Sequence, residues 1–206
     1  MPKAETQTAR DRILCTASEL FYEHGFHAVG VDLIIERAGV AKATLYRHFP
    51  TKDDLICAYL EDADARFSEW FDASINPDVT PAEALVGIFD AVAILATSPG
   101  CLGCTFQVTA AEFPEASHPG HAVALAHKQA VRRRLRELAM EAGARRPDEF
   151  ADGLLLLMDG AFAAARMHGH DNPGGQVGAV ARTLIAAHTS PHVLSSIESG
   201  VRSVER

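Results

Sequence analysis

Basic, hydroxyl-bearing and aromatic side chains gather in "GVAKATLYRHF", residues 39–49. Such side chains suit a polyanion, because Lys42 can reach guanine or a phosphate and Thr44 offers a hydroxyl and a methyl group to either. Ala43 is small enough for the backbone to approach a base. Lys52 falls near the start of the next helix, whose free amides attract phosphate. The predicted nucleic-acid contacts are Lys42, Ala43, Thr44, Tyr46, His48 and Lys52.

Two short helices must position these side chains. "VDLIIERA" follows Gly30 and ends at Gly39, and "KATLYRHF" resumes helical spacing three residues later. Two helices joined by a short turn that contains glycine form a helix-turn-helix unit, whose second helix lies in the major groove of DNA. An ordinary helical corner with solvated cations is the alternative that the local pattern leaves open.

The remaining chain also has helical periodicity and almost no strand signal. A first helix carries the apolar stripe from Ile13 to Phe21 and ends at Gly25, and a long fourth helix begins after Thr51. We therefore predict an all-α protein. The further helices are expected at about 81–97, 104–112, 119–143, 147–168 and 175–189.

Charge is distributed unevenly along a chain of 206 residues with a formal net charge of -8. Residues 1–55 carry seven Lys/Arg and eight Asp/Glu, whereas the rest carry twelve and nineteen. Positive potential on one face can still hold DNA, while the acidic remainder suppresses indiscriminate binding. Because the N-terminus lacks an apolar signal region and no apolar run spans a bilayer, we expect a cytoplasmic protein without a membrane partner.

Residues 13–60, "ILCTASELFYEHGFHAVGVDLIIERAGVAKATLYRHFPTKDDLICAYL", resemble the N-terminal DNA-binding domain of the TetR family of transcriptional regulators. The resemblance implies a three-helix helix-turn-helix domain over 1–52 and a larger helical ligand-binding and dimerisation domain over 53–190. A polar tail over 191–206 would follow. The six contacts named above match positions that the family uses against DNA. Ala41 stands where many members have serine, so a hydroxyl cap or contact is lost there.

The resemblance also implies that the last two long helices join two protomers in a four-helix bundle. "GLLLLMDGAFAAARM" and "VGAVARTLIAAH" supply the apolar and small residues that such a homodimer needs, although a purely internal core helix would look similar. A ligand pocket would lie between the fourth helix and the helices around the domain core. Its candidate residues are Phe67, Trp70, Phe71, Phe89, Phe106, Gln107, Phe113, Met158, Asp159, Phe162 and Arg166.

Other chemistry-bearing residues carry weaker signals. Cys101 and Cys104 in "CLGC" are a possible redox pair, but the chain lacks the βαβ context of a thiol enzyme, so no enzymatic activity is expected. Five scattered histidines and the basic run "VRRRLRE" are more typical of exposed helix faces and loops. We predict no metal and no cofactor.

The sequence thus favours a homodimeric repressor that a small apolar or aromatic ligand releases from a palindromic DNA operator. The alternative is a DNA-binding regulator that responds to thiol oxidation or to a protein partner. The identity of the effector, the operator sequence and the choice between repressor and activator are not readable from the residues.

Overall fold

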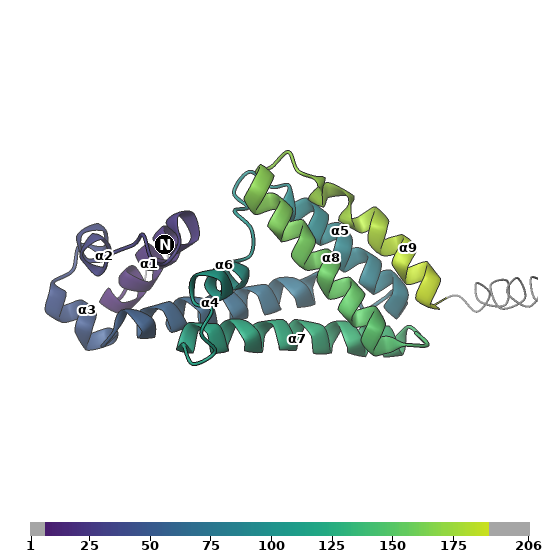
Figure 1. Cartoon of the computed structure of the whole chain (residues 1–206), viewed down its shortest axis with the longest axis horizontal. Coiled ribbons are helices and arrows are strands. Elements are labelled where there is room, and N and C mark those ends of the chain that lie inside the picture. Colours follow the sequence, from purple (N-terminus) through teal and green to yellow (C-terminus); the bar gives the residue numbers. More distant parts are fainter. Residues whose placement is uncertain (1–6, 190–206) are drawn as a thin grey trace, which may run out of the picture. The chain divides into compact units, whose positions relative to one another are not determined.

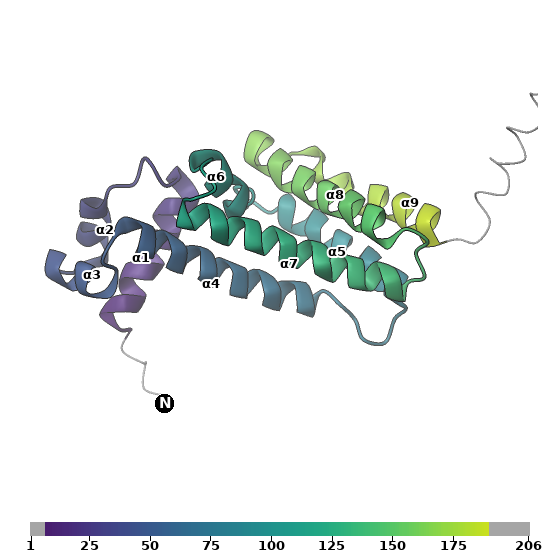
Figure 2. The same ribbon diagram turned by 60° about the horizontal axis from the view of Figure 1, so that its bottom comes forward.

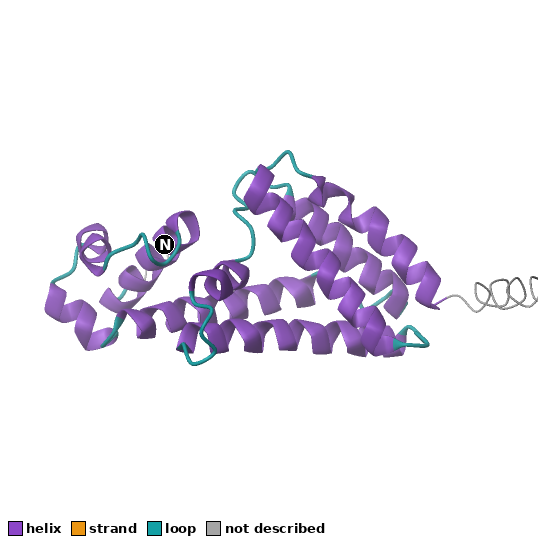
Figure 3. Ribbon diagram, in the orientation of Figure 1, coloured by secondary structure: helices purple, strands orange, loops and turns teal. Residues whose placement is uncertain are grey.

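A computed structural model of the chain describes residues 7–189, and within that range the chain forms helices and no strand (Figure 3). The predicted all-α class is confirmed. The helices are α1 (Ala9–His24), α2 (Val31–Ala38), α3 (Lys42–His48), α4 (Lys52–Ala73), α5 (Pro81–Ala96), α6 (Thr105–Glu112), α7 (Pro119–Glu141), α8 (Pro147–His168), the 3-10 helix η1 (Pro173–Gln176) and α9 (Val177–Thr189). We call α1–α3 the head.

Local capping chemistry explains where several helices begin. Thr80 accepts a hydrogen bond from the Glu83 amide, and the Glu83 carboxylate accepts one from the Thr80 amide, which together form a capping box before α5. Thr51 and Asp54 make the same reciprocal pair before α4. The last helix starts later than predicted, at Val177, because a turn of 3-10 helix occupies residues 173–176.

By their internal contacts, the residues form two compact units, while the DNA-binding domain over 1–52 and the ligand-binding and dimerisation domain over 53–190 stay predictions. Within the described residues, the first unit comprises 7–69 and 104–129, and the second comprises 70–103 and 130–189. The reason lies in packing, since Phe106, Phe113 and Ala124 share one apolar core with the head. The predicted tail 191–206 lies outside the described residues.

Aromatic rings dominate the core of the first unit. Phe21 and Phe26 lie 5.2 Å apart between ring centroids, and Tyr59 of α4 lies 5.8 Å from Phe21. Phe26 also contacts Phe113, at 5.6 Å. Figure 1 places α6 and the first turns of α7 along α4, and the Tyr59 hydroxyl of α4 donates to the Thr105 hydroxyl oxygen of α6 at 2.8 Å. The core thus joins the head to segments that are distant in sequence.

The second unit is built mainly from α5, α8 and α9, which contact one another (Figure 2). Leu85 and Phe89 of α5 and Leu154 of α8 are completely buried, as is Ala181 of α9. Gly178 of α9 leaves room for the Asp90 carboxylate of α5, because a Cβ there would lie 2.3 Å from one of its oxygens. Among the helices of residues 7–189, none has both the length and the apolar composition needed to cross a membrane.

Candidate functional site

The turn between α2 and α3 has the geometry that the sequence predicts. Gly39 ends α2 with a φ of 63°, in the left-handed region that favours glycine, and its amide donates to the Glu36 carbonyl oxygen. The Val40 amide donates to Ile35. Ile34 and Leu45, 0% and 1% exposed, hold the two helices against the core. A helix-turn-helix is therefore present at residues 31–48.

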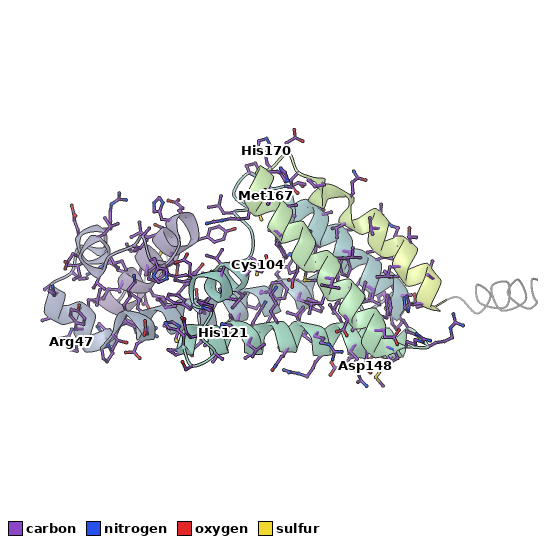
Figure 4. All side chains as sticks on the ribbon, viewed as in Figure 1. Arg47, Cys104, His121, Asp148, Met167 and His170 are labelled. Carbon is purple, nitrogen blue, oxygen red and sulfur yellow. The ribbon has the colours of Figure 1, made fainter. Side chains whose placement is uncertain are left out.

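Helix α3 presents one face to solvent, and Leu45 fixes which one. Each helical residue turns the side chain by about 100°, so Ala43 and Arg47 lie nearly opposite Leu45. Both are exposed, as is Tyr46 at 40%. Thr44 is half-buried and flanks this side. We call Ala43, Thr44, Tyr46 and Arg47 the outer face of α3, and Figure 4 labels Arg47 on it.

Arg47 is the residue that the predicted contact set omits. An exposed guanidinium can bind a phosphate or the O6 and N7 atoms of guanine in a bidentate way. Its place could have been found from the sequence, because Leu45 is the apolar residue of this helix and Arg47 falls opposite it at helical spacing. The predicted His48, by contrast, is half-buried.

Lys42 is exposed and its amine lies 3.3 Å from the Asp32 carboxylate at the start of α2. Both side chains are well exposed, at 65% and 86%, so water screens the pair and it is readily exchanged for a phosphate. Ala41 precedes the helix without a side-chain cap, as expected where serine is absent. The Thr44 and Leu45 amides donate instead to the Ala41 carbonyl oxygen.

Lys52 has a different environment from the other predicted contacts. Its amine donates a 2.6 Å hydrogen bond to the Phe26 carbonyl oxygen in the turn between α1 and α2. Burial lowers the pKa of Lys52 from its ordinary value, and the nearby Glu112 and Asp53 carboxylates oppose that shift. Lys52 therefore ties the start of α4 to the head. The structure does not test the phosphate contact that the sequence predicts for Lys52, and the carbonyl contact favours a structural role for its amine.

The predicted ligand-binding residues divide between the two units. In the first, Phe106 is buried and stacks on His127 with ring centroids 3.6 Å apart, and Phe67 meets the same imidazole edge-on at 4.9 Å. Phe113 is buried and Gln107 is half-buried. Phe67 and Phe106 therefore contact a histidine that the predicted set lacks.

His127 is one of the five histidines expected on exposed faces and loops, and for this residue the expectation is wrong, because it is buried. Its side chain is 2% exposed, and Nδ1 lies 2.6 Å from the Asp64 carboxylate of α4. Helical spacing gives a partial signal, because His127 falls in line with Ala124 and Val131 on the apolar side of α7. The pairing with Asp64, 63 residues away, has no local signal.

In the second unit, the predicted residues are mainly core. Phe71, Phe89, Met158 and Phe162 are buried, Trp70 and Asp159 are half-buried, and Arg166 is exposed. The Arg134 guanidinium lies 4.0 Å above the Phe71 ring. The Arg166 guanidinium donates to the Leu102 carbonyl oxygen at 3.4 Å. The structure thus assigns packing contacts to this group, and a ligand pocket stays a prediction.

The four cysteines are free thiols in different environments. Cys101 is buried, whereas Cys104 is half-buried and precedes the first residue of α6 (Figure 4). Burial raises the pKa of Cys15 and of Cys57, and neighbouring carboxylates add to both shifts. Across residues 7–189, no three His, Cys, Asp or Glu side chains gather in a way that would hold a metal ion.

Comparison with known proteins agrees with this geometry. A family model described as "Bacterial regulatory proteins, tetR family" matches residues 13–59, which include the helix-turn-helix. The HTH-type transcriptional activator FasR of Mycolicibacterium smegmatis is 48% identical over 52 residues, which are 25% of this chain and 24% of that protein. That likeness is confined to a small part of each protein.

Two solved structures match far more of the chain. A TetR-family transcriptional regulator from Streptomyces coelicolor is 33% identical, with 88% of this chain and 96% of that chain covered and a TM-score of 0.84. A TetR-type transcriptional regulator from Streptomyces avermitilis is 32% identical, with 88% and 98% covered and a TM-score of 0.78. With this identity across nearly the whole fold and a helix-turn-helix in place, the chain belongs to the TetR family of DNA-binding transcriptional regulators.

Proposed function

We propose that the chain is a homodimeric repressor that binds a palindromic operator and leaves it when a small apolar or aromatic ligand binds. The observation that carries the dimer is an exposed apolar side of α8. Leu156 and Met167 are 72% and 79% exposed, and Gly160 and Ala163 lie between them. Figure 4 labels Met167 near the end of the helix. We call these four residues the outer face of α8.

Contact with a second copy of the chain would remove the apolar side chains of this face from water, which is favourable. The four residues recur at intervals of four, three and four, so they line one side of the helix. Small side chains at Gly160 and Ala163 permit close approach, and the two large apolar residues would be buried by a two-fold related helix. Val180 of α9, 48% exposed, would extend the surface.

Two recognition helices are also what the DNA requires. Helix α3 has seven residues and therefore spans about 10 Å, enough to read only a few base pairs. A two-fold dimer would place two such helices in successive major grooves, about 34–36 Å apart, and would select an inverted repeat. The proposed DNA contacts are Lys42, the outer face of α3 and, at its flank, His48.

Ligand control would act on the spacing of the two heads. The effector must bind one conformer more tightly than another to change affinity for DNA. Helix α4 is a continuous helix from Lys52 to Ala73 that takes part in both compact units, so it is a lever between them. The proposed pocket residues are those predicted from the sequence, together with His127. The cytoplasm, where bacterial DNA lies, is the proposed location.

The dimer is tested by one charge on the outer face of α8. Leu156→Glu would leave an unpaired carboxylate in the interface, at a cost of several kcal/mol, and sedimentation should then show monomers. Ile94→Glu is the matched control, because Ile94 of α5 is 73% exposed and lies outside that face. A stable Leu156→Glu dimer, or equal dissociation of both variants, would rule out this surface.

The repressor and its effector need separate experiments. A duplex selected from a random library by the wild-type protein should contain an inverted repeat, and a reporter carrying it should be less active when the protein is present. Increased activity would instead indicate an activator, which is how FasR is named. Thermal-shift screening with a metabolite library should then find a ligand that also weakens DNA binding. If none does, regulation by oxidation or by a protein partner becomes the better proposal.

A further inference from the structure

The turn between α1 and α2 is held by the end of α6. The Glu112 carboxylate accepts hydrogen bonds from the amides of Phe26 and His27, at 2.9 Å and 2.7 Å, across 86 and 85 residues of sequence. The His27 Nε2 atom lies 3.0 Å from the Glu112 carbonyl oxygen and can donate to it. Side chain and backbone of one residue therefore bind the same turn.

Gly25 makes room for this carboxylate. The residue ends α1 with a φ of 80°, and a Cβ built on it would lie 2.3 Å from Glu112 Oε1. A larger residue would thus meet two separate obstacles, a strained backbone and an oxygen in its place. Because the oxygen is at the end of a flexible side chain, the steric conflict would be relieved by displacing Glu112 from the turn.

The opposite side of the turn is held by Lys52. Its amine donates to the Phe26 carbonyl oxygen at 2.6 Å, so both polar groups of the Phe26 backbone have side-chain partners, one from α6 and one from α4. The Lys52 amine and the Glu112 carboxylate therefore put a positive and a negative charge next to the same turn. We call Gly25, Phe26, His27, Lys52 and Glu112 the turn clamp.

We propose that Glu112 is a positioning residue for the head, through which a movement of α6 reaches the DNA-reading helices directly. The turn leads into α2 and α3 within a few residues, so its attachment fixes where the helix-turn-helix lies relative to α6. This contact from α6 to the turn would transmit movement in addition to α4, because it does not involve that helix. The inference rests on the proposed function, in which the position of the head determines affinity for DNA.

The first test measures the clamp without DNA. Hydrogen-exchange mass spectrometry would follow a peptide spanning residues 22–30 in the wild type, Glu112→Ala and Glu112→Gln. Loss of charge-assisted bonds to two amides should speed exchange about tenfold or more in Glu112→Ala. Glu112→Gln should be intermediate, because its amide oxygen still accepts. Glu115→Ala removes the same charge from an exposed position three residues away and should match the wild type.

A second test measures transmission. By reciprocity, DNA that binds the head must act on α6 to the extent that α6 acts on DNA. A duplex selected by the wild type should therefore slow exchange of a peptide covering 105–112 in the wild type and in Glu115→Ala. In Glu112→Gln, the more conservative variant, the slowing should be at least about threefold smaller if one hydrogen bond carries much of the coupling.

The outcomes separate the two proposals. Unchanged exchange of residues 22–30 in both Glu112 variants would overturn the clamp. Faster exchange there, with an undiminished effect of DNA on α6, would overturn transmission and leave Glu112 a purely structural residue. A wild type that selects no duplex would refute the proposed function and transmission with it, while the exchange of residues 22–30 would still decide whether Glu112 holds the turn.

Discussion

Replacing Arg47 by alanine should reduce the salt dependence of DNA binding by an amount that follows from the geometry of α3. Arg47 lies on the outer face of this helix, nearly opposite the buried Leu45. In a symmetric dimer the change occurs twice, so two phosphate contacts are lost per duplex. Each contact contributes about -0.9 to the slope of log K against log salt. The wild-type and variant slopes should therefore differ by about 1.8.

Lys52→Ala is the matched comparison, because it also removes one positive charge per protomer. The Lys52 amine donates to the Phe26 carbonyl oxygen and is partly buried, so we expect the salt slope to stay close to the wild-type value. The melting temperature should instead fall by about 2–4 °C, the usual effect of losing about 1 kcal/mol in a chain of this size.

Fluorescence anisotropy with a labelled, selected duplex measures both slopes in a salt series. Between about 50 and 200 mM salt, a slope difference of 1.8 makes the loss of affinity roughly tenfold smaller in Arg47→Ala than in the wild type. An unchanged slope in Arg47→Ala would contradict the assignment of the outer face of α3 to DNA. An equal decrease in both variants would instead place Lys52 against phosphate, as the sequence alone predicts.

Other perturbations test the caps and the thiols. Thr80→Ala should lower the melting temperature by about 2–4 °C near neutral pH by removing the cap of α5. The Thr80 hydrogen bonds hold the pKa of Glu83 below its ordinary 4.5, so this stabilisation is complete above pH 4.5 and is lost as the pH falls through the lower, folded-state pKa. The difference between wild type and variant in a pH series of melting curves should shrink accordingly, and a constant difference would contradict the linkage. Iodoacetamide should modify the exposed Cys15 faster in Glu19→Ala than in the wild type, because the Glu19 carboxylate, 3.7 Å from Sγ, adds to the burial that raises the pKa of this thiol, and equal rates by peptide mass mapping would refute that role.

Helix positions were largely predictable because their signals are local. Thr51 and Pro81 stand at helix starts, and Gly25 and Gly39 end helices whose apolar stripes are readable from spacing alone. The helix-turn-helix follows from the same signals. The 3-10 turn before α9 was not predicted. "PGGQ" indicates a loop, and the pattern does not reveal the hydrogen bond from the Gly174 amide to the Asn172 side chain.

Tertiary partners were the part that the sequence did not reveal. Lys52 lies at a helix start, a position typical of a phosphate contact, yet its amine reaches a carbonyl 26 residues earlier. Glu112 and Asp64 are ordinary polar residues of helices until folding places the Phe26 amide beside one and His127 beside the other. Pairings across such separations depend on the packing of the whole unit, and no local pattern encodes them.

The discontinuous first unit has a consequence for engineered sensors that exchange DNA specificity between regulators. A graft that replaces only residues 7–52 would separate the head from Phe106, Phe113 and Glu112, which complete its core and its turn. The grafted head would then meet the recipient's side chains at these positions, which are not matched to its apolar surface or to its first turn. A transplant that carries residues 7–69 together with 104–129 keeps those partners, so chimeras of relatives should be designed with four junctions instead of two.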